Sequence, residues 1–232
     1  GYDERRFCTG DDEMLTYEQL RQNEDVNTYI RHADASLAAL GYTEHSFAHV
    51  TRVAETAAAI LRTLDYPERT VELAQIAAYL HDIGNLVNRE EHSQSGAVMA
   101  FRILDKLGMP ADELATVVTA IGNHDEGNGV PVDALSAALI LADKSDVRRS
   151  RVRNRDLASF DIHDRVNYSV EDSALSIERD EGTITLRLTI NPDYSAIMDY
   201  FEIFLGRMIL CRKAAERLGL RFRLRINGQP LL

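Results

Sequence analysis

The sequence has few cysteines and no long apolar run. Its two cysteines, Cys8 and Cys211, lie far apart and form no CxxC motif. This argues against a disulfide framework and against a cysteine-bound zinc site, and it favours a reducing compartment. No run of about 18 apolar residues is present, so no transmembrane helix is indicated. The first residues also lack a secretory signal pattern. We therefore expect a cytoplasmic protein without a membrane partner.

Basic residues are also in the minority. Lysine and arginine number 26 against 37 aspartates and glutamates, which gives a net charge of −11. Residues 171–232 hold nine acids and nine bases, so the excess of acids belongs to residues 1–170. An acidic surface disfavours long nucleic acid as a partner. It does not exclude a small anionic ligand held by metals and local arginines.

Histidines and aspartates that could bind a metal recur in a fixed order along the chain. Imidazole and carboxylate groups together suit Fe, Mn, Zn or Co. Each candidate alone has a plainer interpretation, because a single histidine is more often a core or surface residue than a ligand. The ordered set as a whole favours a metal site. Its members are His49, His81, Asp82, His92, His124 and Asp143.

The sequence around these residues predicts helices. Apolar residues recur at helical spacing after His49, and His45 lies four residues earlier on the same helix face. The apolar helix that contains His81 and Asp82 ends at a glycine, and its two polar side chains need partners if they are buried. Asp143 interrupts another apolar helix, where an acid is costly unless it is paired or coordinated. The predicted helices span 45–64, 68–83, 93–107, 111–123 and 132–150.

Five segments together resemble the HD superfamily of metal-dependent phosphohydrolases. They read HSFAHVTRVAETA, AAYLHDIGN, EEHSQSGAVMA, AIGNHDEGNG and LILADKSD, and they cover roughly residues 40–150. The resemblance implies a helical HD domain with one metal bound by His49, His81, Asp82 and Asp143. The additional His92 and His124 imply a second metal, with Asp82 bridging the two. This six-ligand version resembles the binuclear subgroup, which includes symmetrical dinucleoside-tetraphosphate hydrolases and cyclic-dinucleotide phosphodiesterases.

The sequence departs from the cyclic-dinucleotide group at three places. Asn85 stands where that group has the lysine of an HDxGK motif, and Asn123-His124 stands where it tends to have paired histidines. His45 replaces a typical glutamate. AIGNHDEG with ADKSDVRR is closer in form to the dinucleoside-tetraphosphate hydrolases. The departures leave open whether His45, Asn123 or Asp125 joins the metal shell.

The implied cofactor is a pair of divalent transition metals. We expect Fe or Mn first, with Zn, Co or Ni as alternatives, because histidine-rich coordination disfavours Mg alone. A bound metal lowers the pKa of water from about 15.7 towards about 7, and two metals about 3.5–4 Å apart can clamp phosphate oxygens. A bridging carboxylate such as Asp82 would set that separation and so contribute to catalysis.

Positive side chains follow the last predicted ligand. Lys144 directly follows Asp143, and Arg149 lies on roughly the same face if the helix continues to residue 150. Lys144 and Arg149 are therefore predicted to contact phosphate and to take part in catalysis, with Arg148 and Arg52 as further substrate-binding residues. For any single arginine the plainer interpretation is a solvated strip paired with nearby acids.

The pattern changes after about residue 165. Residues 174–179, 183–190 and 221–226 alternate in strand fashion, and a helix runs from about 191 to 218. We predict a mainly α protein in two parts, a helical HD domain (residues 1–165) and a small α+β appendage (residues 166–232) of ββαβ order. The appendage helix is apolar on much of its circumference, so we expect packing or a homodimer through this unit, with ligand sensing as an alternative.

The leading functional hypothesis is a phosphohydrolase for a nucleotide or a similar small phosphorylated molecule. A diiron oxygenase on the same scaffold could carry a similar ligand set. The arginine cluster weighs against it, because a substrate without phosphate would not need so much positive charge. A non-catalytic metal- or nucleotide-sensing module is a third hypothesis. The six intact ligands argue against it.

Overall fold

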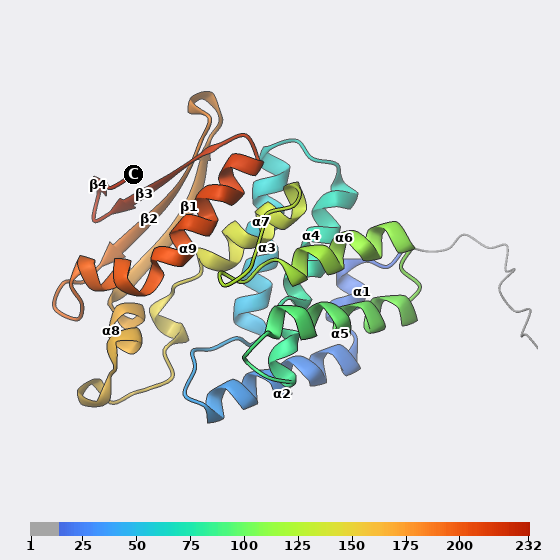
Figure 1. Cartoon of the computed structure of the whole chain (residues 1–232), viewed down its shortest axis with the longest axis horizontal. Coiled ribbons are helices and arrows are strands. Elements are labelled where there is room, and N and C mark those ends of the chain that lie inside the picture. The colour runs from blue at the N-terminus through green and yellow to red at the C-terminus, as the bar shows by residue number, and fades with distance from the viewer. Residues whose placement is uncertain (1–13) are drawn as a thin grey trace, which may run out of the picture.

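The computed structural model describes residues 14–232, and most of them are helical. A bundle of helices packs against a small sheet, with one long helix between them (Figure 1). This confirms the mainly α fold with an α+β unit at the C-terminal end. The bundle comprises α1 (Tyr17–Arg21), α2 (Glu24–Ala39), α3 (Phe47–Thr63), α4 (Glu68–Leu80), α5 (His92–Lys106), α6 (Ala111–Gly122) and α7 (Ala134–Lys144). Short 3-10 turns follow α4 (Ile83–Leu86) and α7 (Arg149–Arg151, Leu157–Ser159).

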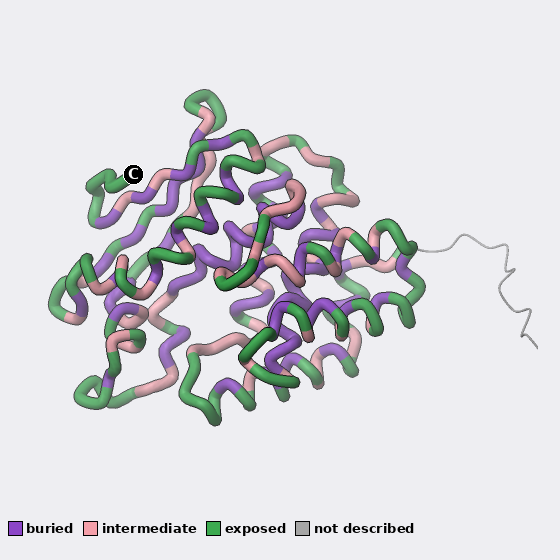
Figure 2. The backbone as a smooth tube through the Cα atoms, viewed as in Figure 1, coloured by how far each residue is buried: buried purple, intermediate pink, exposed green. Residues whose placement is uncertain are grey.

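Helices α3, α4 and α7 form the centre of the bundle. Helices α3 and α4 approach closely because their facing side chains are small. These are Ala54, Ala57, Ala74 and Ala77, which are all fully buried. Helix α7 is buried along 135–144. Figure 2 shows the buried positions gathered where these helices cross. The predicted ligands on these helices therefore sit in the buried centre of the bundle.

Helix α7 ends earlier than predicted. The expected helix over 132–150 is wrong at its C-terminal end, because the structure ends it at Lys144. Ser145 Oγ donates to the carbonyl oxygen of Ala142, and Ser173 Oγ donates to the carbonyl oxygen of Ser145. Such local polar contacts compete with continued helix. The chain turns away as a result, and the arginines after residue 147 do not share the Asp143 face.

The C-terminal unit has the predicted ββαβ order and one additional short strand. Strands β1 (Val170–Glu178) and β2 (Thr183–Ile190) form an antiparallel hairpin. Helix α9 (Ile197–Arg217) then returns the chain, so that β3 (Arg221–Ile226) pairs parallel to β2. Strand β4 (Gln229–Pro230) pairs antiparallel to β3 and gives the order β1-β2-β3-β4. A short helix not predicted from sequence, α8 (Ile162–Ser169), precedes the sheet.

One apolar core extends through both parts of the chain. Helix α9 packs against α7, and its Tyr200, Phe204 and Met208 join the same buried cluster as the bundle side chains. Cys211 is buried in α9, whereas Cys8 lies outside the described residues. The division into residues 1–165 and 166–232 stays a prediction, and so does a homodimer. The packing means that the C-terminal unit lies directly against α7, which carries the predicted ligand Asp143.

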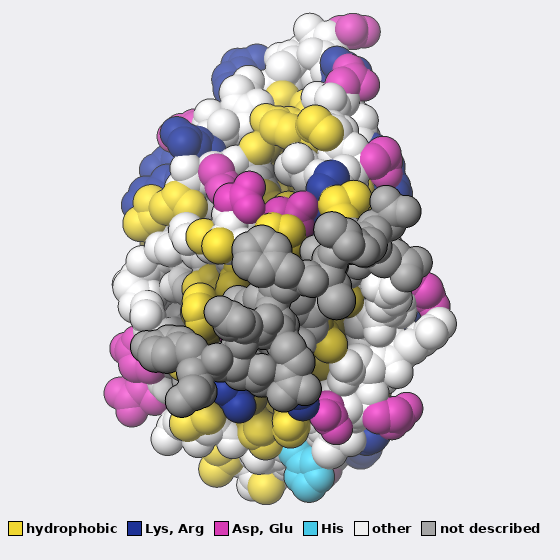
Figure 3. Space-filling model, turned by 90° about the vertical axis from the view of Figure 1, so that its right-hand side faces the viewer, with side chains coloured by type: hydrophobic (Ala, Val, Ile, Leu, Met, Phe, Trp, Pro, Cys, Tyr) yellow, Lys and Arg dark blue, Asp and Glu magenta, His cyan; other side chains and the backbone are white. Residues whose placement is uncertain are grey.

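The surface of the described residues mixes charges of both signs. In the face shown in Figure 3, acidic and basic side chains alternate with patches of hydrophobic ones. Within residues 14–232, no helix combines the length and the apolar character needed to cross a membrane.

A carboxylate at the end of β1 ties the hairpin together. Glu178 accepts hydrogen bonds from Ser176 Oγ, Thr183 Oγ1 and Thr185 Oγ1, and it pairs with Arg187 at 2.8 Å. Burial alone would raise the pKa of Glu178, but these donors lower it from 4.5 to about 2. The ionised carboxylate is therefore favoured in the folded state.

We expect Glu178→Gln to destabilise the protein in a pH-dependent way. The folded-state pKa lies below the unfolded value, so the contribution of Glu178 is full above pH 4.5 and is lost as the pH falls towards 2. Because the side chain is 29% exposed, the substitution should lower the free energy of unfolding at pH 7 by about 1–2 kcal/mol. Urea unfolding from pH 7 to pH 3 measures it, with the exposed Glu181→Gln as control. If the wild type and the variant still differed by the same free energy of unfolding at low pH, the result would contradict this account.

Candidate metal centre

Four predicted ligands converge at the centre of the bundle. His49 comes from the first half of α3, and Asp143 from the last turn of α7. His81 and Asp82 follow the last residue of α4. One ligand atom from each of the four lies within 4.8 Å of the others. All four side chains are buried, with exposed fractions of 0–8%. The structure thus assembles the first predicted ligand group.

The second group shares Asp82 with the first. His92 at the start of α5 and His124 just after α6 join it within the same 4.8 Å limit. Asp82 Oδ2 lies 3.4 Å from His49 Nε2 and 3.2 Å from His81 Nε2. Asp82 Oδ1 lies 3.5 Å from His92 Nε2 and 3.8 Å from His124 Nε2. The carboxylate therefore directs one oxygen to each histidine pair.

A glycine allows the two groups to meet. Gly84 lies in the turn after His81-Asp82, where the turn touches the start of α5. A Cβ atom at Gly84 would lie 1.9 Å from the carbonyl oxygen of His92 and 2.5 Å from the amide nitrogen of Gly96. Any other residue would push α5 away, so this position requires glycine. The glycine of the His-Asp-Ile-Gly sequence thus sets the distance between His92 and Asp82.

Backbone carbonyls fix the tautomers of three histidines. His81 Nδ1 donates to Ala78 at 2.6 Å, His124 Nδ1 to Ile121 at 2.6 Å, and His92 Nδ1 to Arg89 at 3.1 Å. A carbonyl oxygen can only accept, so each Nδ1 carries a hydrogen, and Nε2 is the atom that offers a lone pair when the imidazole is neutral. Outer hydrogen bonds of this kind orient metal-ligating imidazoles in proteins.

The convergent lone pairs fit a cation. His92 Nε2 and His124 Nε2 lie 3.2 Å apart with no hydrogen available between them in this tautomer. His49 Nε2 and Asp82 Oδ2 are buried without a hydrogen-bond partner among the described residues. Such orphaned groups are costly unless something positive binds them. Burial lowers the pKa of His92 to about 3, which keeps its imidazole neutral and able to act as a ligand. The mixed nitrogen and oxygen donors suit a first-row transition metal.

Asp146 orients the remaining histidine and was missed in the sequence. Asp146 Oδ2 accepts from His49 Nδ1 at 2.8 Å. Arg148 donates to both carboxylate oxygens at 2.6 and 3.0 Å, and Arg52 lies 3.6 Å from Oδ1. Burial alone would raise the pKa of Asp146, but the hydrogen bonds from His49 and Arg148 lower it. In the sequence, Asp146 would share a helix face with Asp143 only if that helix continued, and the structure ends the helix at Lys144.

We expect Asp146→Ala to weaken metal binding about 10- to 100-fold, because His49 loses the acceptor that fixes its tautomer. Asp146→Asn should retain much of the affinity, since its amide oxygen can still accept from His49. Titration of the metal-free protein with Mn²⁺ measures both variants. Asp180→Ala at an exposed turn serves as the control. Equal metal affinity in wild type and Asp146→Ala would exclude the proposed role of Asp146 in orienting His49.

Cations line the narrow cavity over the ligands. Lys144 Nζ lies 2.9 Å from Asp143 Oδ2 and 2.9 Å from Glu126 Oε2. Arg207 of α9 donates from Nε to Glu126 Oε1 at 2.7 Å. The sequence predicted Lys144, but it gave no signal for Arg207, which lies in the C-terminal unit. The cavity is lined by His45, Asp82, Arg89, His92, His124, Asp143, Lys144, Arg151 and Arg207.

The predicted phosphate-binding arginines lie elsewhere. Arg149 lies in a different cavity, where it donates to the carbonyl oxygen of Tyr168. Its guanidinium carbon lies 4.4 Å from the centroid of the Tyr168 ring. The expectation that it shares the Asp143 face is corrected, because α7 ends before it. Arg148 and Arg52 line the same second cavity and contact Asp146, which in turn accepts from His49.

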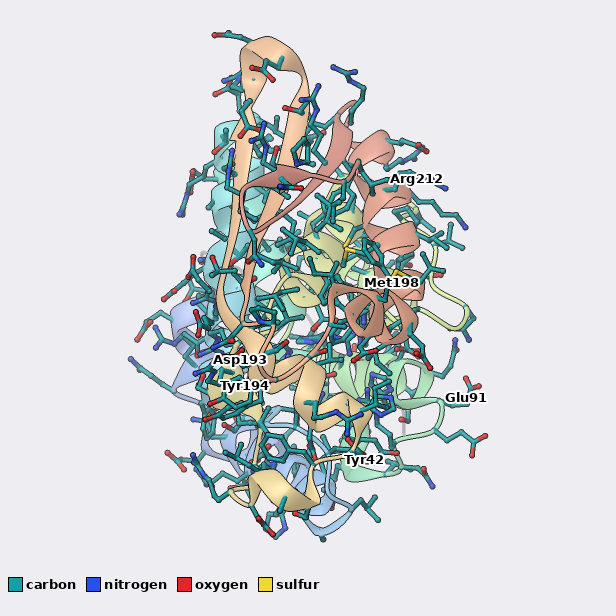
Figure 4. All side chains as sticks on the ribbon, turned by 90° about the vertical axis from the view of Figure 1, so that its left-hand side faces the viewer. Tyr42, Glu91, Asp193, Tyr194, Met198 and Arg212 are labelled. Carbon is teal, nitrogen blue, oxygen red and sulfur yellow. The ribbon has the colours of Figure 1, made fainter. Side chains whose placement is uncertain are left out.

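The three residues left open lie outside both ligand groups. His45 lines the cavity, but its Nδ1 lies 2.6 Å from the carbonyl oxygen of Thr43. Asn123 donates to the carbonyl oxygen of Thr119 at 3.0 Å. Burial raises the pKa of Asp125, which lies beside Glu126. Figure 4 labels Tyr42, Glu91 and Met198, which come from three different segments of the chain.

The sequence matches the HD domain over residues 46–165, which is more than half of the chain and includes all six clustered histidines and aspartates. The chain belongs to the HD-domain family. An uncharacterized protein of Methanocaldococcus jannaschii is 30% identical over 191 residues, which are 72% of this chain and 70% of that protein. The crystal structure of a predicted HD superfamily hydrolase from an uncultured Thermotogales bacterium is 26% identical. It covers 53% of this chain and 67% of its own, with a TM-score of 0.43. Arg207 lies outside the matched HD domain.

Proposed function

We propose that this HD-domain protein is a binuclear metal-dependent phosphohydrolase. Its substrate would be a phosphate ester or phosphoanhydride of a nucleotide or a similar small phosphorylated molecule. The observation that carries the proposal is the shared Asp82 carboxylate, with one oxygen directed to each pair of histidine nitrogens. A carboxylate shared in this way can bridge two metals, and two-metal sites are widely used for phosphoester hydrolysis.

The clustered residues would hold two divalent transition metals, Fe or Mn first. When bound, these ions supply an activated water and positive charge for the phosphate oxygens. The first site would use His49, His81, Asp82 and Asp143, and the second Asp82, His92 and His124.

The chain itself would supply further positive charge to the phosphoryl group. Burial alone would lower the pKa of Lys144, but Asp143 and Glu126 raise it, so the side chain stays charged. Arg207 shares Glu126 with Lys144 and keeps donors that can contact a phosphate. Fixed donors of this kind, in a cavity with little room for water, act most strongly where charge develops in the transition state.

The positive lining also separates this proposal from the alternatives. A diiron oxygenase acting on an uncharged substrate would gain nothing from Arg89, Arg151 and Arg207 around the ligands. A sensing module would bind a nucleotide without releasing phosphate.

A substrate screen tests the proposal. Protein loaded with Mn²⁺ or Fe²⁺ is offered nucleoside mono-, di- and triphosphates, dinucleoside polyphosphates, cyclic dinucleotides and simple phosphomonoesters. We expect phosphate release or bond cleavage with at least one class, lost on chelation and in His81→Ala. Oxygen uptake by the iron-loaded protein without any phosphoester cleavage would favour the oxygenase instead. Tight nucleotide binding without turnover would favour the sensing module.

A further inference from the structure

A second cavity lies on the other side of Asp146 from the metal ligands. Its volume of about 610 Å³ is in the range that binds small organic molecules. It lies where α3 and the segment after α7 meet α8 and β1. It shares no lining residue with the cavity over the metal ligands. A molecule held there would therefore not be in contact with the metals.

The lining of this second cavity is strongly basic. Four arginines line it against only two acids, Glu171 and Asp172, although the protein as a whole carries a net charge of −11. The guanidinium group is suited to bidentate contact with phosphate. Positive charge concentrated in a cleft also raises the local concentration of anions. The four arginines are Arg52, Arg148, Arg149 and Arg155.

These arginines keep donors for a ligand. Arg155 is exposed and has no side-chain hydrogen bond or ion pair with any other residue in 14–232. Arg149 donates from Nε to the carbonyl oxygen of Tyr168 and lies 3.4 Å from Glu171. It also lies 4.4 and 5.5 Å from the ring centroids of Tyr168 and Tyr194. These contacts hold the guanidinium in place, so less conformational freedom would be lost on binding.

One wall of the same cavity is apolar. Val152, Leu157 and Phe160 line it, and Leu157 is 51% exposed although it is a large hydrophobic residue. An inorganic anion would use only the arginines and would leave this wall in water. A molecule with both phosphate groups and a flat ring would use both walls.

We propose that this cavity binds a nucleoside polyphosphate at a site separate from the metal centre. Its phosphates contact the arginines and its base packs on the apolar wall. The bound phosphates compete with Asp146 for Arg148, whose two hydrogen bonds now hold that carboxylate. Asp146 in turn holds His49, so the site is connected to the metal centre through a chain of direct contacts.

Calorimetric titration with ATP tests the site. The protein is kept in EDTA, so that neither metal-bound ATP nor hydrolysis contributes and the result does not depend on the proposed enzymatic function. We expect one ATP per chain and an affinity about tenfold lower in Arg155→Glu, because an unpaired cation is replaced by an anion. Tripolyphosphate and adenosine should each bind at least about tenfold more weakly than ATP, because each lacks one half of the contacts.

Two control variants separate this cavity from other sites. Arg212→Glu removes an exposed arginine of α9, far from Tyr194 in Figure 4, and should leave the affinity unchanged. Arg207→Ala alters only the cavity over the metal ligands and should also leave it unchanged. No ATP binding would overturn the proposal. It would equally be overturned if Arg207→Ala, and not Arg155→Glu, removed the binding, or if tripolyphosphate bound as tightly as ATP.

Nuclear magnetic resonance of histidine-labelled protein tests the connection to His49. In EDTA, ATP should shift the imidazole nitrogen signals of His49, identified by their absence in His49→Gln. The signals of His32 on α2 should not move, because His32 is not in the chain of contacts. Bound ATP with unchanged His49 signals would disprove the connection.

Discussion

Asp82→Asn is expected to lower the metal content to one ion or fewer per chain and to reduce hydrolysis by about a thousandfold or more. The amide keeps the shape of the carboxylate, but only one of its two outer atoms is an oxygen. It can therefore serve one histidine pair and presents an NH₂ group to the other. In the wild-type structure, the two oxygens of Asp82 lie 3.2–3.8 Å from four histidine nitrogens.

Metal analysis and kinetics on the same preparation measure this effect. Asp105→Asn on the exposed face of α5 is the matched control, because it makes the same chemical change far from the ligands. Asp105→Asn should keep both metals and full activity. Two tightly held metals in Asp82→Asn would show that the carboxylate does not bridge.

Arg207→Ala is expected to lower kcat about 100-fold while leaving the metal content unchanged. The side chain lines the cavity over the ligands and pairs with Glu126, but it contacts no predicted ligand. Removal of one positioned donor to a developing oxyanion costs roughly 10²–10³ in kcat. Arg207→Lys should recover part of the rate, because it restores the charge without the bidentate geometry.

The control for this variant is Arg212→Ala, which removes an exposed arginine from the same helix. Hydrolysis within twofold of wild type in Arg207→Ala would exclude a role in the reaction. Loss of metal together with activity would instead indicate that Arg207 only supports the structure of the site.

The ligands could be predicted from sequence because each lies in its own local pattern. His81 and Asp82 end an apolar helix, and Asp143 interrupts another, so the cost of burying them was visible without a structure. The alternating residues of β1, β2 and β3 identified the sheet for the same reason, since each pattern is confined to a few neighbouring residues.

Contacts between distant segments could not be predicted in this way. Asp146 is recognisable only once α7 ends at Lys144 and the chain turns towards His49, 97 residues away in sequence. Arg207 reaches the cavity because α9 packs on α7, which depends on the shape of the whole core. Arg149 was misplaced because a helix was extended past Ser145, where local polar contacts end it.

The metal content of wild type and of the His92→Ala/His124→Ala double variant is the most direct test of the two-metal account. These two histidines serve only the second group, so the first group keeps all four of its residues. We predict two transition metal ions per chain in wild type and one in the double variant, with hydrolysis lost. One ion in both proteins, with activity unchanged, would contradict the binuclear site.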